Sequence, residues 1–172
     1  MKIFYIEIDN FKKKHSKDSL IPYADRKFKT EKRFYEYTIG RYLIKTVSQH
    51  YYNIKDTSIT INHNGKPFFK NYPIHFSISH SKNIVMACFD RHNCGIDIEY
   101  NKARNLRSLS EYFNEEFRTL EEFYKFWTLR ESSIKLADSV EYQHFQKFND
   151  NYYFTVVSNN KNTDSIELIN LE

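Results

Sequence analysis

The chain has 172 residues, of which 40% are hydrophobic, enough for one domain or for two small halves that share a core. Its 26 basic and 22 acidic residues leave a net charge of +4, a weak excess that indicates an acidic partner or an anionic ligand. Only Cys88 and Cys94 are present, which excludes a zinc cluster or a disulfide framework and favours free thiols in a reducing compartment.

The N-terminal segment predicts a first strand. Residues 2–8 alternate apolar and polar side chains, and the acids Glu7 and Asp9 do not fit the apolar centre of a secretory signal. No apolar run approaches the ~20 residues that a membrane span requires. We therefore expect a cytoplasmic protein with no part in the membrane.

A long helix and a hairpin are expected next. Apolar residues recur at helical spacing across residues 25–52. Residues 57–69 then predict a strand, a turn at Asn64 and Gly65, and a second extended piece.

The rest of the sequence completes an α+β pattern. Three extended runs separated by polar turns predict a meander of sequential strands, at residues 74–79, 84–89 and 95–100. A helical region over residues 108–139, with Ser110 or Asn114 as N-cap, leads to two final strand-like segments. We expect an α+β fold in two halves, at residues 1–100 and 101–172.

Two acids in the segment GIDIEY suggest a site. Side chains of a strand alternate between its faces, so Asp97 and Glu99 share one face, roughly 6.5 to 7 Å apart, opposite the apolar Ile96 and Ile98. Two unpaired carboxylates at that distance would repel each other. They therefore favour a common cationic partner.

The helix that follows carries a third acid. In FWTLRESSIKL, Trp127, Glu131 and Lys135 are spaced by four residues and lie along one stripe. Mg²⁺ prefers oxygen ligands, which Asp97, Glu99 and Glu131 could supply. Lys135, one turn further on, could meet a phosphate that the metal bridges.

Each of these residues also has an ordinary structural interpretation. The two strand acids could form the solvent face of an edge strand, and Glu131 with Lys135 could be a helix ion pair of about 0.2 to 0.5 kcal/mol. His80 could be a hydrogen-bonded turn histidine and Lys66 an exposed turn lysine. Trp127 is more often a core residue than a ligand contact.

Taken together, the motifs resemble the 4′-phosphopantetheinyl transferase superfamily of the surfactin-synthetase-activating type. The strand G-[IV]-D-[IV]-E and the helix W-[ST]-x-K-E-[SA]-x-x-K of that family match residues 95–99 and 127–135. Its G-K-P turn, F-[NS]-[IL]-S-H-S run and G-R-x-L-[LI]-[RK] helix match residues 65–67, 76–81 and 40–45.

The resemblance implies a fold and an activity. The fold would consist of two pseudo-symmetric α+β halves, the second shortened at the C-terminus. The enzyme would be a monomer of the holo-[acyl-carrier-protein] synthase type. It would transfer the phosphopantetheine arm of coenzyme A to a serine of an acyl or peptidyl carrier protein and release adenosine 3′,5′-bisphosphate.

The resemblance also assigns residue roles. Asp97, Glu99 and Glu131 would ligate Mg²⁺, and Glu131 would also be the base for the serine proton. Lys135 would hold phosphate oxygens and act in catalysis.

The remaining roles concern coenzyme A. His80 would contact its 3′-phosphate with Ser79 beside it, and Lys66 with its turn would border the adenine.

The chain departs from the family pattern at three places. Arg130 replaces a lysine, which changes the donor geometry. Glu36 stands near the place of an arginine for the 3′-phosphate, so that Arg33, Lys32 or Lys29 would supply the cation. The resemblance also fades after about residue 157, and an apolar edge exposed there would need a cover.

Other classes remain as alternatives. A shortened relative could bind coenzyme A or a carrier with little or no transfer. A Mg²⁺-dependent nuclease would commonly have a lysine two residues after the second acid, where Asn101 stands. The aromatic residues fall mostly at core spacings without an RNA-binding signature, so we expect no nucleic acid partner.

Overall fold

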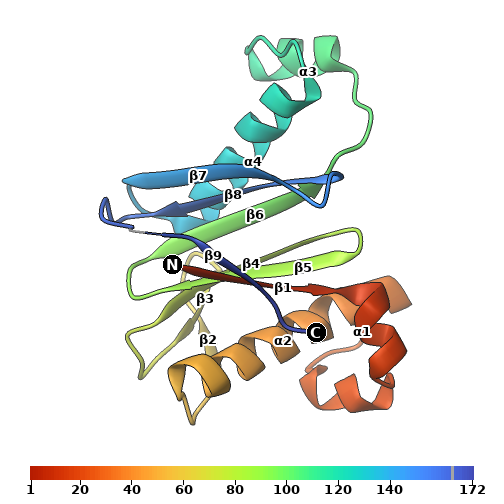
Figure 1. Ribbon diagram of the computed structural model, residues 1–172, viewed down its shortest axis with the longest axis vertical. Coiled ribbons are helices and arrows are strands. Elements are labelled where there is room, and N and C mark those ends of the chain that lie inside the picture. The colour runs from red at the N-terminus through yellow and green to blue at the C-terminus, as the bar shows by residue number, and fades with distance from the viewer. Residues whose placement is uncertain (164) are drawn as a thin grey trace.

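The computed structural model describes residues 1–163 and 165–172 and shows a mixed α+β structure, as expected (Figure 1). The helices are α1 (Ile8–Lys14), the 3₁₀ helix η1 (Asp18–Tyr23), α2 (Glu31–Tyr52), α3 (Leu106–Phe113) and α4 (Leu120–Leu136). The strands are β1 (Lys2–Glu7), β2 (Ile59–Ile61), β3 (Pro67–Phe69), β4 (His75–Ser81), β5 (Ile84–Asp90), β6 (Cys94–Tyr100), β7 (Tyr142–Phe148), β8 (Tyr152–Ser158) and β9 (Glu167–Asn170).

Two main sheets form the centre of the molecule. The first has the strand order β4-β5-β1-β9 and the second β6-β8-β7, while β2 and β3 form a separate hairpin. All these pairs are antiparallel except β1 with β9, which is parallel. In Figure 1, α2 lies on the outer side of the first sheet and α4 beside the second. Within the described residues, no helix has both the length and the apolar character to cross a bilayer.

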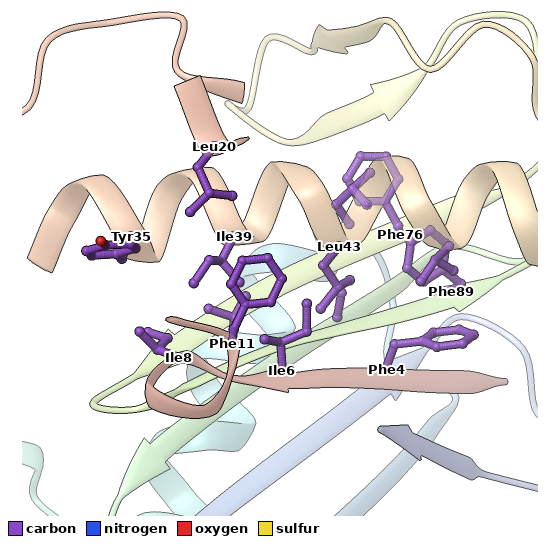
Figure 2. Packing of buried hydrophobic residues seen from close by; sticks show 14 of the residues in the cluster. Phe4, Ile6, Ile8, Phe11, Leu20, Tyr35, Ile39, Leu43, Phe76 and Phe89 are labelled. Atoms are coloured by element: carbon purple, nitrogen blue, oxygen red, sulfur yellow. The ribbon is translucent and has the colours of Figure 1, made fainter. Parts of the chain in front are cut away.

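The alternation of β1 divides the core into layers. Phe4 and Ile6 are buried against the α2 stripe that includes Ile39 and Leu43 (Figure 2). Ile3, on the opposite face of β1, belongs to a second buried cluster with residues of the second sheet. Burial of each large apolar side chain contributes about 1.5 to 3 kcal/mol, so these two layers fix both sheets relative to α2.

Capping explains where the helices differ from expectation. The helix expected from residue 25 begins at Glu31, because Thr30 accepts a hydrogen bond from the Arg33 backbone and ends the preceding loop. The expected N-caps Ser110 and Asn114 are wrong.

The second helical region is in fact two helices, each with its own cap. Asn105 caps α3, and Ser110 lies inside that helix. Asn114 is its C-cap in the left-handed conformation, which asparagine tolerates. Thr119 caps α4 through a capping box with Glu122.

The strand pairing also differs from the prediction, at β6. β4 and β5 pair as expected, but β6 pairs with β8, Asp97 opposite Thr155, so the expected meander of three strands is wrong. The strand β7 and the short helix α1 were not expected. The division into halves at residue 100 stays a prediction, although β6 pairs with β8 of the second half.

Helix α4 approaches β6 closely at Gly95. A Cβ atom at Gly95 would lie 2.1 Å from the Ser132 carbonyl oxygen and 2.8 Å from the Leu136 nitrogen. These are backbone atoms of α4 that have no freedom to turn aside. Glycine is therefore required for α4 to lie against the strand that carries Asp97.

We expect Gly95→Ala to lower the free energy of unfolding by about 3 kcal/mol, the upper end of typical overpacking losses. Gly40→Ala is the matched control. Its Cβ would meet the flexible end of Ile78 at 2.9 Å, and the helix preference for alanine offsets part of that contact. Urea unfolding measures both variants. A Gly95→Ala protein as stable as the wild type would contradict this close approach.

Candidate active site

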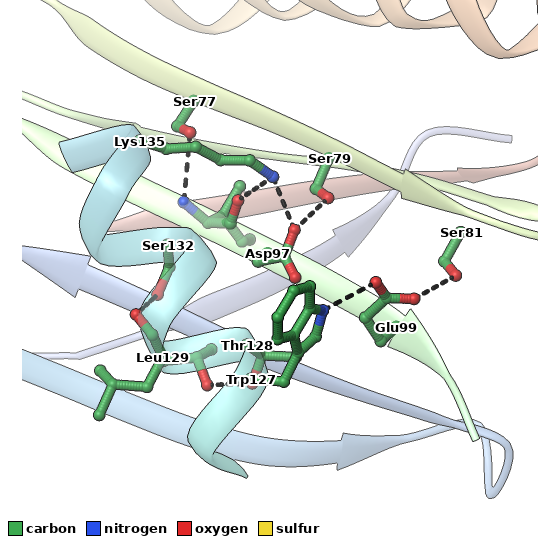
Figure 3. Close-up of polar contacts among 12 residues, drawn as sticks. Ser77, Ser79, Ser81, Asp97, Glu99, Trp127, Thr128, Leu129, Ser132 and Lys135 are labelled. Atoms are coloured by element: carbon green, nitrogen blue, oxygen red, sulfur yellow. Dashed lines mark hydrogen bonds and ion pairs between the residues drawn. The ribbon is translucent and has the colours of Figure 1, made fainter. Parts of the chain in front are cut away.

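Serine side chains join the adjacent edges of the two sheets. β4 and β6 share no backbone ladder, and alternate residues of β4 bridge them instead. The Ile96 backbone N–H donates to Ser77 Oγ at 3.2 Å (Figure 3). The Tyr100 N–H donates to Ser81 Oγ at 3.0 Å. We call this contact the serine seam, formed by Ser77, Ser79 and Ser81.

The seam holds Asp97 in a buried position. Ser79 Oγ donates to Asp97 Oδ1 at 2.8 Å, and Lys135 Nζ donates to the same oxygen at 2.6 Å and to the Ile96 carbonyl at 3.1 Å. Only 6% of Asp97 is exposed, so the solvent-face interpretation does not hold for it. Its second oxygen, Oδ2, is buried and has no hydrogen-bond partner within the described structure.

Glu99 is held by the same seam and by α4. Trp127 Nε1 donates to Glu99 Oε1 at 3.2 Å, and Ser81 Oγ donates to Oε2 at 3.1 Å. The Trp127 ring also packs against Phe113 and Phe123. Trp127 is therefore both a core residue and a donor that orients a carboxylate.

Glu131 lies on α4 midway between two residues that touch the strand carboxylates. Trp127 and Lys135 are each four residues away from it, and they contact Glu99 and Asp97 respectively. Helical spacing thus directs Glu131 toward the same strand. No hydrogen bond or ion pair joins its side chain to another described residue, and the helix ion pair with Lys135 is not formed.

The three carboxylates fit a hard cation only in part. Across residues 1–163 and 165–172, no group of three or more His, Cys, Asp or Glu side chains is gathered as a metal cluster. The unpartnered oxygen of Asp97 and the oriented Glu99 nevertheless offer oxygen donors of the kind that Mg²⁺ prefers. The donor chemistry fits a magnesium ion, and the role of Glu131 as a ligand stays a prediction.

A pocket of about 800 Å³ opens beside the Asp97 contacts, although none of the three carboxylates lines it. This volume suits a nucleotide-sized ligand. Ser79 and Lys135, which both bond Asp97, also line the pocket. Basic side chains surround it, namely Arg26, Lys27, Lys29, Arg33 and Arg41. Apolar residues complete its wall, including Ile59, Pro67, Phe76 and Ile78.

His80 and Glu36 meet at one corner of this pocket. Glu36 is 4% exposed, and its carboxylate lies 3.6 Å from His80 Nδ1. Burial lowers the pKa of His80, and Arg33, Lys135 and Lys32 lower it further against the opposing effect of Glu36. His80 is a residue of β4, so the turn-histidine interpretation is wrong.

Lys66 points away from the pocket that its turn borders. Gly65 and Pro67 line the pocket. The Lys66 ammonium instead donates to Asn93 Oδ1 and, at 2.7 Å, to the Cys94 carbonyl. Burial lowers its pKa. Lys66 is thus a partly buried anchor of the hairpin on β6, and its contact with adenine stays a prediction.

Arg130 packs against aromatic rings. Its guanidinium carbon lies 5.4 Å from the Phe113 ring centroid and 5.9 Å from that of Trp127. Arginine suits this stacked position better than lysine because its cation is planar.

Sequence reasoning missed several residues that shape the site. Ser77 and Ser81 alternate with Ser79 in SISHS, and that spacing of two was the available signal. Arg26 and Arg41 both lie over the Tyr37 ring and bond its hydroxyl. The four-residue step from Tyr37 to Arg41 alone does not indicate that arrangement.

The chain is similar to several curated proteins of one kind. The chain is 31% identical to the 4′-phosphopantetheinyl transferase gsp of Aneurinibacillus migulanus over 134 residues, 71% of this chain and 54% of that protein. It is 28% identical to ffp of Bacillus subtilis over 155 residues, 78% and 69% respectively. It is 30% identical to Sfp of Bacillus subtilis strain 168 over 123 residues, 64% and 55%.

These similarities define the class of protein. The chain belongs to the 4′-phosphopantetheinyl transferase superfamily, of the Sfp type. The matched part spans about half the length of gsp and of Sfp. No family model matches the chain.

We expect Lys135→Met to lower the free energy of unfolding by about 3 kcal/mol, because it leaves the buried Asp97 carboxylate without its cation. The double variant with Asp97→Asn is expected to lose less than the sum of the two single variants. Urea unfolding of all four proteins measures this coupling. Strictly additive losses would contradict the pair.

Lys147→Met is the matched control, because Lys147 pairs with Asp150 at the surface, where the partner side chain is 96% exposed. Such exposed pairs contribute little, so no measurable loss is expected.

Proposed function

We propose that the protein transfers the 4′-phosphopantetheine arm of coenzyme A to a serine of an acyl or peptidyl carrier protein. The observation that carries this proposal is that Ser79 and Lys135 both line the pocket and both donate hydrogen bonds to Asp97. A nucleotide diphosphate in the pocket would therefore place its phosphates beside the carboxylates. The similarity to named 4′-phosphopantetheinyl transferases supports the same reaction.

The basic wall of the pocket suits the charge of coenzyme A. Phosphoryl transfer depends on positioning and on neutralising charge at the reacting phosphate. Lys135 would hold phosphate oxygens, and the apolar wall at Pro67 and Phe76 would face the adenine. His80 would meet the 3′-phosphate side of the nucleotide, with Ser79 beside it.

Asp97, Glu99 and Glu131 would hold Mg²⁺, which supplies charge neutralisation at the diphosphate when bound. The serine seam and Trp127 keep Asp97 and Glu99 in fixed orientations, so little reorganisation is needed on binding. Glu131 would accept the proton of the incoming serine, directly or through a water.

The proposal also covers the arrangement of the fold, the oligomeric state and the cellular compartment. The two sheets with α2 and α4 would correspond to two pseudo-symmetric halves. The enzyme would act as a monomer in the cytoplasm, where buried free thiols such as Cys88 and Cys94 stay reduced.

We expect Glu131→Gln to reduce transfer to an apo-carrier protein by at least about 100-fold, the range for loss of an acid–base group, without loss of fold. Incubation with coenzyme A and Mg²⁺, followed by mass spectrometry of the carrier, measures transfer. Glu121→Gln, on the exposed face of the same helix, is the control and keeps full activity. Near-normal transfer by Glu131→Gln would show that Glu131 has another role.

We expect chelation of divalent metal to abolish transfer and added Mg²⁺ to restore it, because the carboxylates alone repel a diphosphate. The same carrier assay measures this, with circular dichroism to confirm that the fold persists. Full transfer in excess chelator would contradict the magnesium site. A carrier that stays unmodified under all conditions, with coenzyme A still bound, would leave the binding-only alternative.

A further inference from the structure

The hairpin of β2 and β3 forms one wall of the pocket of about 800 Å³. Four of its residues line that pocket, namely Ile59, Ile61, Gly65 and Pro67. A hairpin of two strands is at best marginally stable by itself, so its position depends on contacts with the rest of the chain. Phe69 holds the base of the hairpin, because its ring is buried in the main core. The tip of the hairpin needs a separate anchor.

The anchor of the tip is Lys66. Within the described residues, the hydrogen bonds that join residues 62–66 to the chain outside the hairpin all start at the Lys66 ammonium. This ammonium donates to Asn93 Oδ1 and, at 2.7 Å, to the Cys94 carbonyl. The position of the tip therefore depends on where the Asn93 side chain lies.

The Asn93 side chain is fixed in turn by the end of α4. Its Nδ2 atom donates to the Leu136 carbonyl at 2.8 Å, and this carbonyl belongs to the last turn of α4, where no helical N–H can reach it. The Asn93 backbone carbonyl accepts hydrogen bonds from Ser158 Oγ and from the Asn159 N–H, each at 3.2 Å. The amide nitrogen of Asn93 thus bonds a rigid helix end, and its oxygen is presented to the hairpin.

Asn93 has no place in the wall of the pocket itself. Among the described residues that line the pocket of about 800 Å³, Asn93 does not occur. It lines a second cavity of about 560 Å³, together with Lys66. The last turn of α4 also carries Lys135, which does line the first pocket and is held by Asp97 and the Ile96 carbonyl. Asn93 therefore connects the hairpin wall to the turn that carries Lys135, without contact with a ligand in that pocket.

We propose that Asn93 is a positioning residue for coenzyme A, because it sets the distance between the hairpin and the last turn of α4. The inference rests on the proposed function and adds to it a residue that the donor does not touch. Loss of the Asn93 side chain would release the hairpin tip, whereas Lys135 would keep its own contacts with Asp97. Donor binding is therefore weakened, and the chemical step changes little.

The test measures transfer to one carrier protein at varied concentrations of coenzyme A. We expect Asn93→Ala to raise the KM for coenzyme A at least about fivefold, with kcat and the KM for the carrier within about twofold of the wild type. Asn93→Asp keeps an acceptor for Lys66 and loses only the donor to Leu136. A smaller rise, of at least about twofold, is expected for it.

Asn10→Ala is the matched control. The Asn10 side chain also donates a hydrogen bond, to Glu7 at 3.0 Å, but it lies on α1 outside the pocket. Its KM for coenzyme A is expected to equal that of the wild type. An unchanged KM in Asn93→Ala, or in Asn93→Asp if the alanine variant fails to fold, would overturn the inference.

A double variant separates the hairpin anchor from a general loss of stability. The anchor is already lost in Lys66→Met, so adding Asn93→Ala is expected to raise the KM for coenzyme A by less than about twofold further. The same fivefold factor in both backgrounds would show that Asn93 does not act through the hairpin.

Hydrogen exchange gives a readout that does not depend on transfer. We expect the amides of residues 62–69 to exchange at least about tenfold faster in Asn93→Ala, with those of β1 unchanged. Unchanged exchange at residues 62–69 would overturn the inference.

A binding measurement distinguishes this inference from the proposed function. If the wild type modifies no carrier, the transfer reaction fails, and calorimetric binding of coenzyme A replaces the KM. A dissociation constant raised at least about fivefold in Asn93→Ala supports the inference. Equal dissociation constants, or no binding by the wild type, overturn it.

Discussion

The serine seam between β4 and β6 is the contact on which the rest of the structure depends. It joins two sheets that share no backbone ladder at this edge, and each of its hydrogen bonds contributes about 0.5 to 1.5 kcal/mol. The same hydroxyls orient Asp97 and Glu99. A loss of the seam would therefore weaken the contact between the sheets and remove one donor from each carboxylate.

Charge is distributed unevenly around the pocket that adjoins this seam. Lys135 pairs with Asp97 and lines the pocket. Glu36, in the pocket wall, pairs with Lys32, Arg33 and His80. Two buried acids on different elements therefore each hold basic side chains beside one pocket.

The sequence predicted the α+β class, the hairpin at Gly65 and the strand of Asp97 and Glu99, because alternation and turn residues are local signals. It did not predict that β6 pairs with β8, since pairing depends on contacts between distant segments. The caps Asn105 and Thr119 were missed because several polar residues nearby were equally suitable. The site residues were predicted from their motif. The serine seam and the contacts of Glu36 with His80 could not be predicted, because they join segments that are distant in the sequence.

The parallel pairing of β9 with β1 has a consequence for how the chain folds. β1 lies between β5 and β9, and Glu167 is opposite Lys2. β1 is made well before its neighbour β9, so its sheet gains this last pairing only when residues 167–170 have been made. Until then one side of β1 has unpaired backbone groups, which are a template for pairing with other chains. Slow translation of the residues between β5 and β9 would prolong this aggregation-prone stage.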